Sequence, residues 1–600
     1  MQQTGDIMRD ASLLAISFIL TASVVIAADA PSSAKTAAEI DRLILNDTAT
    51  DSLQQVDDAT FLRRVSLDLV GRPPTSGEIT AFGLSPSESK HSDVVQKLLA
   101  SDDYAANWSR YWRDAIFRPA TNVRAAFVRP AFEEWMADNL SENRPWDAVV
   151  TDLLTATGTV NDNGATALIF AHEGQPEEIA AEASRLFLGI QIQCANCHNH
   201  PWDRWKREQF HELVAFFPRI TLRRDPQSDK RYEYVITSAD RDRSRRPGVS
   251  KFLLTRVDRN RDQIISEAEA KGTPLQRVFS GQGRNYIDKN GDGKLSIEEI
   301  QTAQPPDNNR PGQGATEHYM ADLSDPGSKG TLIQPGFFMG EVDVPQGQSD
   351  ADRRATAAGL FTSQQNEWFA KAIVNRMWAE LTASAFYSPI DDIGPDRNAE
   401  HPEVLAALSE GFVANGHDLK WLLTTITSTR FYQRPVNTKA DGFLKLEPTR
   451  LRSDQLYDAL CQTLNVTNLS LPFNGRRTPN AQSEDRGRLQ FAATFGFDPS
   501  TPRSDLTGNI PEALFLMNSP QLNQAIKADT TNSLITRISS IVQNDEDAVR
   551  ELYLATVSRE PTAKELFICR KHLNAAATRN EGFEDVLWSL LNSTEFQSKS

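Results

Sequence analysis

Apolar residues recur at three- and four-residue spacing through most of the sequence, a pattern typical of amphipathic α-helices that pack against one another. The pattern runs from residue 38 to about residue 219 and resumes from residue 350 to the end. We therefore predict a mainly α protein. Because 600 residues exceed what one hydrophobic core usually serves, we expect a multi-helix N-terminal domain at 36–220 and a helical C-terminal domain at 350–600.

The region between the two helical parts has a different composition. Residues 304–349 are rich in Pro, Gly, Asn and Asp, which predicts a linker. Just before it, residues 247–303 carry two stretches in which acidic and amide side chains alternate with other residues at fixed spacing. These stretches predict a separate cation-binding unit between the domains.

The stretch DKNGDGKLSIEE, residues 288–299, has the spacing of the twelve-residue calcium loop of an EF-hand. Gly293 stands at the sixth position, where the chain turns sharply. Calcium takes six to eight oxygen ligands, and this spacing wraps them round one ion. The predicted ligands, at positions 1, 3, 5, 7 (through its carbonyl), 9 and 12, are Asp288, Asn290, Asp292, Lys294, Ser296 and Glu299.

The earlier stretch DRNRDQIISEAE, residues 258–269, has the same spacing with one departure. Its sixth position is Gln263 rather than glycine, so a residue with a side chain must take up a positive φ, and we expect weaker binding. Ile265 and Leu295 stand at the eighth positions and predict a short β pairing that joins the loops. The predicted ligands are Asp258, Asn260, Asp262, Ile264 (through its carbonyl), Ser266 and Glu269. Residues 247–303 are thus predicted to form an EF-hand pair.

The N-terminus predicts export. Arg9 precedes an uncharged stretch at 11–28, and small residues follow up to residue 30, so residues 1–30 read as a secretory signal peptide. Alternatively the stretch remains as an anchor, which is the only membrane contact we expect. We predict a periplasmic or cell-envelope protein. A formal net charge of −16 argues against a nucleic-acid partner, since phosphate binding needs a basic face, and suits calcium ions.

Residues 194–205, CANCHNHPWDRW, concentrate half of the four cysteines of the chain with two histidines. Cys194, Cys197 and His198 have the C-x-x-C-H spacing of haem c attachment, in which both thiols take the vinyl groups and the histidine is the proximal ligand. The second axial ligand is not identified by the sequence; the candidates are His211, His172, Met320 and Met339.

The same cluster has other interpretations. Zinc or another transition metal at 194–203 would use Cys194 and Cys197 with two of His198, His200, Asp203 and His211, because sulfur and imidazole suit a tetrahedral ion. A Cys194–Cys197 disulfide, or no cofactor at all, also fits. Cys461 and Cys569 lie on apolar helix faces and are predicted to be buried free thiols. The tryptophans of this region are predicted to pack in the interior, with a haem-pocket role as the alternative for the last two: Trp108, Trp112, Trp202 and Trp205.

Several blocks of the sequence resemble a family of exported planctomycete proteins. FLRRVSLDLVGRPPT (61–75), LLASDDYAANWSRYWRD (98–114) and the block that contains CANCHNHPWDRW are similar to a cytochrome c-like domain of unknown function. NEWFAKAIVNRMWAEL (366–381) and the block that begins DDIGPDRNAEHPEV (391–404) are similar to a planctomycete-specific domain of unknown function. The resemblance implies a cytochrome-like function carried by Cys194, Cys197 and His198, with the EF-hand pair as an insertion.

These observations support more than one function. The first hypothesis is an exported calcium-binding protein that carries haem c and transfers electrons to a redox partner protein. The second is a structural or interaction protein of the envelope that calcium and another metal stabilise, and a third is a metal-dependent hydrolase that uses the same cluster. The sequence contains no G-x-S-x-G or H-E-x-x-H signature, so catalytic residues stay unassigned.

Overall fold

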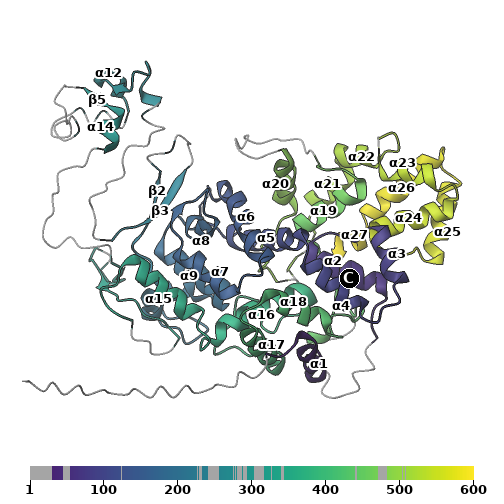
Figure 1. The fold of residues 1–600 in the computed structure, drawn as a ribbon, viewed down its shortest axis with the longest axis horizontal. Helices are drawn as coiled ribbons and strands as arrows, with labels where there is room; N and C mark the ends of the chain where they lie inside the picture. Colours follow the sequence, from purple (N-terminus) through teal and green to yellow (C-terminus); the bar gives the residue numbers. More distant parts are fainter. Residues whose placement is uncertain are drawn as a thin grey trace, which may run out of the picture.

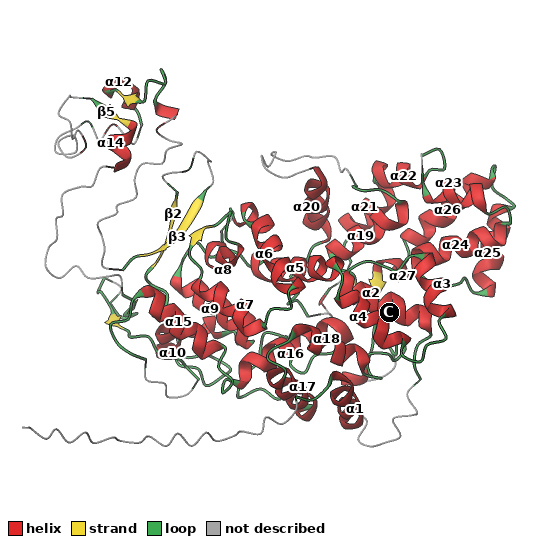
Figure 2. Cartoon of the chain, viewed as in Figure 1, coloured by secondary structure: helices red, strands yellow, loops and turns green. Residues whose placement is uncertain are grey.

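The prediction of a mainly α protein is confirmed by a computed structural model (Figures 1 and 2). The structure describes residues 30–44 and 54–599, except for 123, 226–227, 229–232, 241–253, 255, 274–275, 277–278, 280–286, 288–293, 303–316, 326, 340–343, 439–441, 470–482, 503–504, 507 and 531. The predicted signal peptide therefore lies outside the described residues. Within these ranges no helix combines the length and apolar character needed to cross a bilayer.

The first part of the chain forms a set of short helices joined by capped turns. Helix α2 begins after Asp57, whose side chain accepts a hydrogen bond from the Thr60 N–H, and it ends at Gly71, which has a φ of 73°. Both caps satisfy backbone groups that the helix itself leaves unpaired. The helices are α1 (Ser33–Ile44), α2 (Asp58–Val70), α3 (Ser76–Leu84), α4 (Lys90–Leu99), α5 (Asp102–Phe117), α6 (Arg129–Ser141), α7 (Trp146–Thr155), α8 (Ala167–Ala171), α9 (Pro176–Leu188) and α10 (Arg207–Val214).

These helices share one hydrophobic core with the beginning of the C-terminal region. The core extends from Ile40 to Ile236 and continues from Phe337 to Phe443. In it α15 packs against α7, and α16 packs against α9, so segments far apart in sequence lie side by side (Figure 1). The helices added here are α15 (Asp350–Phe361), α16 (Glu367–Thr382), α17 (Pro402–Ala414) and α18 (Leu419–Ser428).

The rest of the chain forms a second hydrophobic core between Leu451 and Phe596, which also takes in Leu67 of α2. The chain end returns to this boundary, because β9 (Ser598–Lys599) pairs with β8 (Thr449–Arg450) in an antiparallel arrangement. The helices of this part are α19 (Ser453–Leu464), α20 (Ser483–Phe495), α21 (Ile510–Asn518), α22 (Pro520–Ile526), α23 (Leu534–Ile541), α24 (Asp545–Val557), α25 (Ala563–Leu573), α26 (Arg579–Leu591) and α27 (Thr594–Gln597).

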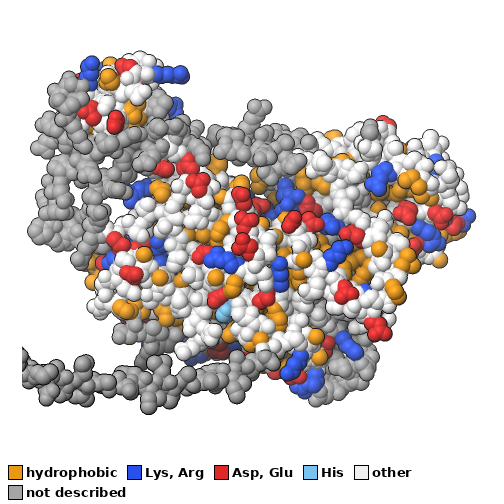
Figure 3. All heavy atoms as spheres, viewed as in Figure 1, with side chains coloured by type: hydrophobic (Ala, Val, Ile, Leu, Met, Phe, Trp, Pro, Cys, Tyr) orange, Lys and Arg blue, Asp and Glu red, His pale blue; other side chains and the backbone are white. Residues whose placement is uncertain are grey.

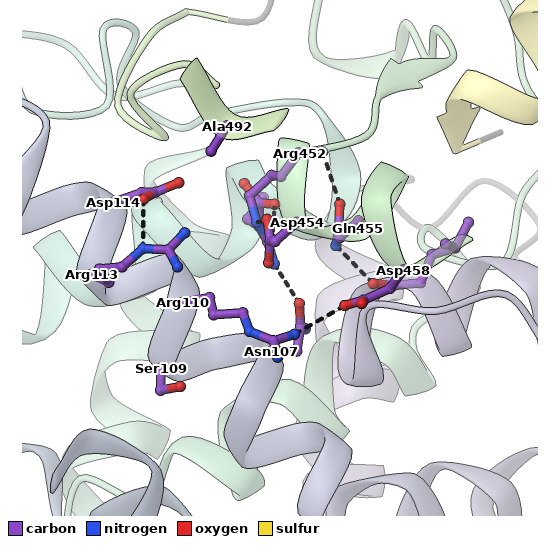
Figure 4. Close-up of polar contacts among 12 residues, drawn as sticks. Asn107, Ser109, Arg110, Arg113, Asp114, Arg452, Asp454, Gln455, Asp458 and Ala492 are labelled. Atoms are coloured by element: carbon purple, nitrogen blue, oxygen red, sulfur yellow. Dashed lines mark hydrogen bonds and ion pairs between the residues drawn. The ribbon is translucent and has the colours of Figure 1, made fainter. Parts of the chain in front are cut away.

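A polar network joins the two cores between α5 and α19, buried round Arg452 and partly buried at the Arg110–Asp458 pair (Figure 4). Arg110 on α5 forms an ion pair with Asp458 on α19, with 2.9 Å between Nη1 and Oδ2. Arg452, directly before α19, donates hydrogen bonds to Asn107 on α5 and to Glu380 on α16. Buried polar groups are costly unless they are paired, so these contacts fix how the cores meet.

Strands are few and short in the described part of the chain. Strand β3 (Tyr234–Ser238) lies between β1 (Gly158–Thr159) and β2 (Ile220–Arg224) in an antiparallel sheet. Strand β6 (Tyr319–Met320) pairs with β7 (Thr331–Leu332). A separate small unit, with its own apolar cluster, stands apart from the helical body in Figure 1. It contains β4 (Ile264–Ile265), α12 (Glu267–Ala270), β5 (Leu295–Ser296) and α14 (Ile297–Thr302).

Candidate functional site

The small unit holds the loop at 258–269, whose backbone matches two sequence predictions. Gln263, at the sixth position, has a φ of 63°, in the left-handed region that glycine adopts most easily. Ile265 lies opposite Leu295 in the antiparallel pairing of β4 with β5. The positive φ and the β pairing are thus both confirmed, and they give the loop the sharp turn and the link that a paired calcium loop needs.

The acidic side chains of this loop point toward its own backbone. Asp258 is buried; its Oδ2 accepts from the Gln263 N–H at 2.9 Å, whereas its Oδ1 has no hydrogen-bond partner in the described part of the chain. The Glu269 carboxylate reaches across the loop to the Arg259 N–H at 3.1 Å and accepts from Ser266 at 2.6 Å. Hydrogen bonds from Ser266 and the backbone lower the pKa of Glu269. An anionic loop with an unpartnered buried oxygen fits a hard cation.

The second predicted loop is described only in part. Asp288, Asn290 and Asp292 lie outside the described residues. Of the other predicted ligands, Lys294 precedes β5, and Ser296 donates from its Oγ to the Glu299 carboxylate at 2.8 Å. Glu299 thus holds the same place at the start of its helix as Glu269 does in the first loop.

The cysteine cluster follows directly on helix α9. Gly189 ends that helix with a φ of 67°, and a 3₁₀ turn, η4 (Ile192–Asn196), turns Ile192 and Ala195 inward. The thiols of Cys194 and Cys197 are exposed and free. The sequence therefore delivers both sulfurs to the surface on one short turn, where a covalent modification can reach them.

His198 is held in an orientation that suits a ligand. Its Nδ1 lies 2.7 Å from the Asn199 carbonyl oxygen, and the ring is exposed. A carbonyl oxygen only accepts hydrogen bonds, so Nδ1 carries the hydrogen and Nε2 of the neutral ring keeps a free lone pair. Histidines that ligate metals usually have this second contact.

The remaining predicted ligands of the cluster do not gather round the thiols. His200 Nδ1 accepts from the Trp202 N–H at 3.3 Å, and burial raises the pKa of Asp203. No three or more His, Cys, Asp or Glu side chains converge anywhere in the described ranges, either here or in the first calcium loop. The structure thus leaves the four-ligand zinc interpretation without added support.

His211, a candidate for both the metal and the second axial position, instead forms a buried pair with His318. Its Nδ1 lies 2.8 Å from Nε2 of His318, and its Nε2 donates to the Asn196 carbonyl at 3.1 Å. Burial lowers the pKa of both rings, so the neutral pair is favoured. This pair supports the backbone between the two cysteines, and sequence reasoning did not identify His318, which lies in the predicted linker.

The other axial candidates lie in different surroundings. His172 is buried at the end of α8, and neither of its ring nitrogens has a hydrogen-bond partner in the described part of the chain. Burial lowers its pKa. Met320 lies in β6, and Met339 packs against the first core, both partly buried. None of these positions singles out a second axial ligand.

Each helical region matches a known protein-family model in comparisons with known proteins. Residues 39–221 match PSCyt2, a protein of unknown function (DUF1549), and residues 353–573 match PSD1, a protein of unknown function (DUF1553). The chain combines the PSCyt2 and PSD1 domains, in that order. Together the matches cover about two thirds of the sequence. No curated protein and no solved structure matches the chain.

The cysteine cluster of the PSCyt2 domain rests on one segment of the PSD1 domain, residues 391–397. Gly394 lies so close to Asp203 that an added Cβ would be 1.9 Å from its Oδ2. Arg397 donates to the Trp202 carbonyl at 3.2 Å, and the Ile393 N–H donates to the Gly189 carbonyl at 2.7 Å. The PSD1 segment thus holds both ends of the cluster.

The same segment is anchored by charge. Asp391 is buried and accepts from Arg185 on α9 and from Arg376 on α16. Glu182 also binds Arg185, and these carboxylates outweigh burial to raise the pKa of that guanidinium. Asp391 thereby links the two domains directly beneath the cluster. In the sequence this segment stands out only as the block DDIGPDR, which does not reveal that Asp391 pairs with Arg185 and Arg376.

The remaining cysteines and tryptophans complete the comparison with the sequence predictions. Cys461 and Cys569 are free thiols, partly and fully buried, and burial raises the pKa of both, to about 11 for Cys461. Trp205 packs edge-to-face on Phe338, as predicted for an interior residue. Trp202 does not: its side chain is 74% exposed, because the loop turns it outward, so that prediction was wrong.

Proposed function

We propose that this chain is a calcium-binding protein of the extracytoplasmic space in which calcium stabilises the unit between the PSCyt2 and PSD1 domains. The observation that carries the proposal is the buried Asp258 carboxylate, which has one unpartnered oxygen in a loop whose sixth residue already has a positive φ. Calcium is abundant outside cells, so a weak loop there is constantly filled. A stabilising role therefore suits these loops better than a signalling role. The placement outside the cytoplasm rests on the N-terminal sequence alone.

Replacement of the last ligand of each loop tests calcium binding. Glu269→Ala and Glu299→Ala should each remove one bound ion in calorimetric titration of the full chain and reduce the rise in melting temperature that calcium produces. Each substitution also removes a helix cap, which lowers stability by about 1 kcal/mol. Thermal unfolding in the presence of a chelator measures this loss of stability without the contribution of calcium. The matched control is Glu267→Ala, two residues from Glu269, which should keep the full calcium response. Equal melting of the unsubstituted chain in calcium and in chelator would contradict the stabilising role.

The second candidate function is electron transfer through haem c on the PSCyt2 domain. It is favoured by the contact of His198 Nδ1 with the Asn199 carbonyl, which leaves Nε2 free in a segment that also carries two exposed thiols. The donors present fit the group: Cys194 and Cys197 would hold it covalently and His198 would ligate the iron. Haem c, when bound, supplies a one-electron couple. A redox partner protein would then dock near this loop.

An absorption spectrum tests this second function. Protein exported from cells that attach haem c should show a Soret band that persists after denaturation. The double variant Cys194→Ser, Cys197→Ser should lose the band, and His198→Ala should lose or shift it. His200→Ala, in the same loop, is the matched control and should retain it. A band that washes out on denaturation, or stoichiometric zinc in its place, would contradict covalent haem.

A further inference from the structure

A cavity of about 700 Å³ lies where the two hydrophobic cores meet, away from the calcium loops. Its walls come from the end of α16 and the turn after it, from residues 443–450, from residues 499–502, 506 and 508, and from the chain end at 594–598. Small-molecule sites typically have volumes of ~300–1,000 Å³ and lie between packed elements. Size and position therefore make this cavity a candidate ligand site.

Every arginine and lysine that the structure places on its walls is paired with a carboxylate. Arg450 Nη2 lies 2.5 Å from Glu512 Oε1, with both side chains largely buried. Arg376 binds Asp391, and Glu380 binds Arg452 at 2.8 Å. At the exposed rim, Lys445 pairs with Glu447 at 2.8 Å. A strongly anionic ligand would have to compete with the carboxylates that hold these basic groups, which is costly where the pairs are buried. The Glu400 carboxylate on the same wall would also repel it.

A neutral polar ligand can use these pairs without breaking them. A paired carboxylate keeps lone pairs and a paired guanidinium keeps N–H groups, so neighbouring hydroxyls can donate to one and accept from the other. The hydroxyls of Ser384 and Thr501 add further partners on the wall. Ser384 donates to the Phe443 carbonyl at 3.0 Å, so its oxygen remains available as an acceptor.

Apolar residues share the walls with these groups. Phe443 lines the cavity and belongs to an aromatic cluster, with its ring centroid 6.0 Å from that of Trp378 and 5.4 Å from that of Phe386. Ile390 and three prolines add further apolar wall. A ligand that presents hydroxyls at its edges and C–H groups on its faces matches such a lining.

We propose that this cavity binds a saccharide, a neutral polyhydroxylated ligand. The paired arginines and lysine select against phosphates and acidic peptides, because each would compete with a protein carboxylate. The mixed polar and apolar lining provides both hydrogen-bond partners for the hydroxyls and contact for the ring faces. This binding is independent of calcium and of any group on the cysteine cluster.

The test uses the full chain with maltotriose and cellotriose as probes, titrated by calorimetry, with inorganic phosphate and an acidic peptide as comparison probes. Thr501→Trp fills the cavity from a half-buried loop position without touching either core. Thr80→Trp, on the exposed face of α3, is the matched control. Glu512→Gln keeps the shape and the helix cap at Asn509, since glutamine also caps, but weakens the acceptor.

The expected result is binding of at least one trisaccharide to the unsubstituted chain and to Thr80→Trp. Affinity should fall about tenfold in Glu512→Gln, and binding should be lost in Thr501→Trp at unchanged melting temperature. Failure of both trisaccharides to bind, or equal binding to all variants, would overturn the proposal. Phosphate or peptide binding that Thr501→Trp blocks, without trisaccharide binding, would overturn the saccharide assignment as well.

Discussion

Gln263 is the residue at which the sequence and the structure agree most closely. The spacing of DRNRDQIISEAE required a positive φ at this position, and the backbone has one. For a residue with a side chain this conformation costs roughly 1–2 kcal/mol, a cost that glycine does not bear. The first loop therefore holds strain, whereas the sequence of the second loop has glycine, Gly293, at the equivalent position.

Replacement of Gln263 by glycine should relieve that strain. We expect Gln263→Gly to raise the free energy of unfolding by about 1 kcal/mol and to strengthen calcium binding at the first loop severalfold. Gln263→Ala is the matched control, because it removes the same side-chain atoms but keeps the Cβ. Calcium titration and chemical denaturation of both variants measure the effect. Equal behaviour of glycine and alanine would show that the backbone is not strained.

Sequence reasoning could not identify every contact of the candidate site. The cysteine pair could be found from local spacing, because Cys194 and Cys197 lie within one short segment. The pairing of His211 with His318 joins residues more than a hundred positions apart, and no periodicity reports such a contact. Trp202 is a related case: an aromatic residue is expected to be buried, but the turn decides its direction.

At the scale of elements, the segment 391–397 decides where the cysteine cluster sits. Gly394 allows the PSD1 backbone to approach Asp203, and Asp391 fixes the segment to α9 and α16. Helix periodicity predicted both helices. It could not predict the loop contact, because that contact depends on a glycine, which has no side chain, and on buried ion pairs. A block of sequence that reads as an ordinary turn is thus a structural support for the candidate site.

A methyl group at Gly394 should disturb this contact. We expect Gly394→Ala to lower the free energy of unfolding by about 1 kcal/mol, at the low end for overpacking because the Asp203 carboxylate can rotate away. Gly359→Ala, in an open position within α15, should instead stabilise the protein by roughly 0.5–1 kcal/mol. Chemical denaturation measures both. If the clash is real, adding Asp203→Ala to Gly394→Ala should cancel most of the loss; additive effects would refute it.

At the scale of the whole molecule, the two family domains are less separate than their sequences suggest. The first hydrophobic core takes helices from both sides of the calcium-loop region, and among the described residues the second takes Leu67 alone from the first half. A hydrophobic stripe predicts that a helix face is buried but not which helix covers it. On the face shown in Figure 3, acidic and basic side chains are intermingled.

The network that joins the two cores makes the stability of the molecule depend on pH. Burial opposes ionisation of the Asp454 carboxyl, but the positive charges of Arg452 and Arg113 outweigh it and lower its pKa to about 2 from the ordinary 3.8. A carboxyl whose pKa is lowered by folding stabilises the protein above its unfolded pKa. That contribution, on the order of 2 kcal/mol, is lost as the pH falls from about 4 to about 2.

We therefore expect Asp454→Asn to be less stable than the unsubstituted chain at neutral pH, and its free energy of unfolding to change less between pH 4 and pH 2. Urea denaturation across that window measures both, with calcium chelated throughout so that loss of the ion at low pH does not contribute. Asp529→Asn, at an exposed turn, is the matched control and should follow the unsubstituted chain. If Asp454→Asn kept the full acid sensitivity, other carboxylates would control the junction of the cores, and Arg452 would be held by Glu380 rather than by Asp454.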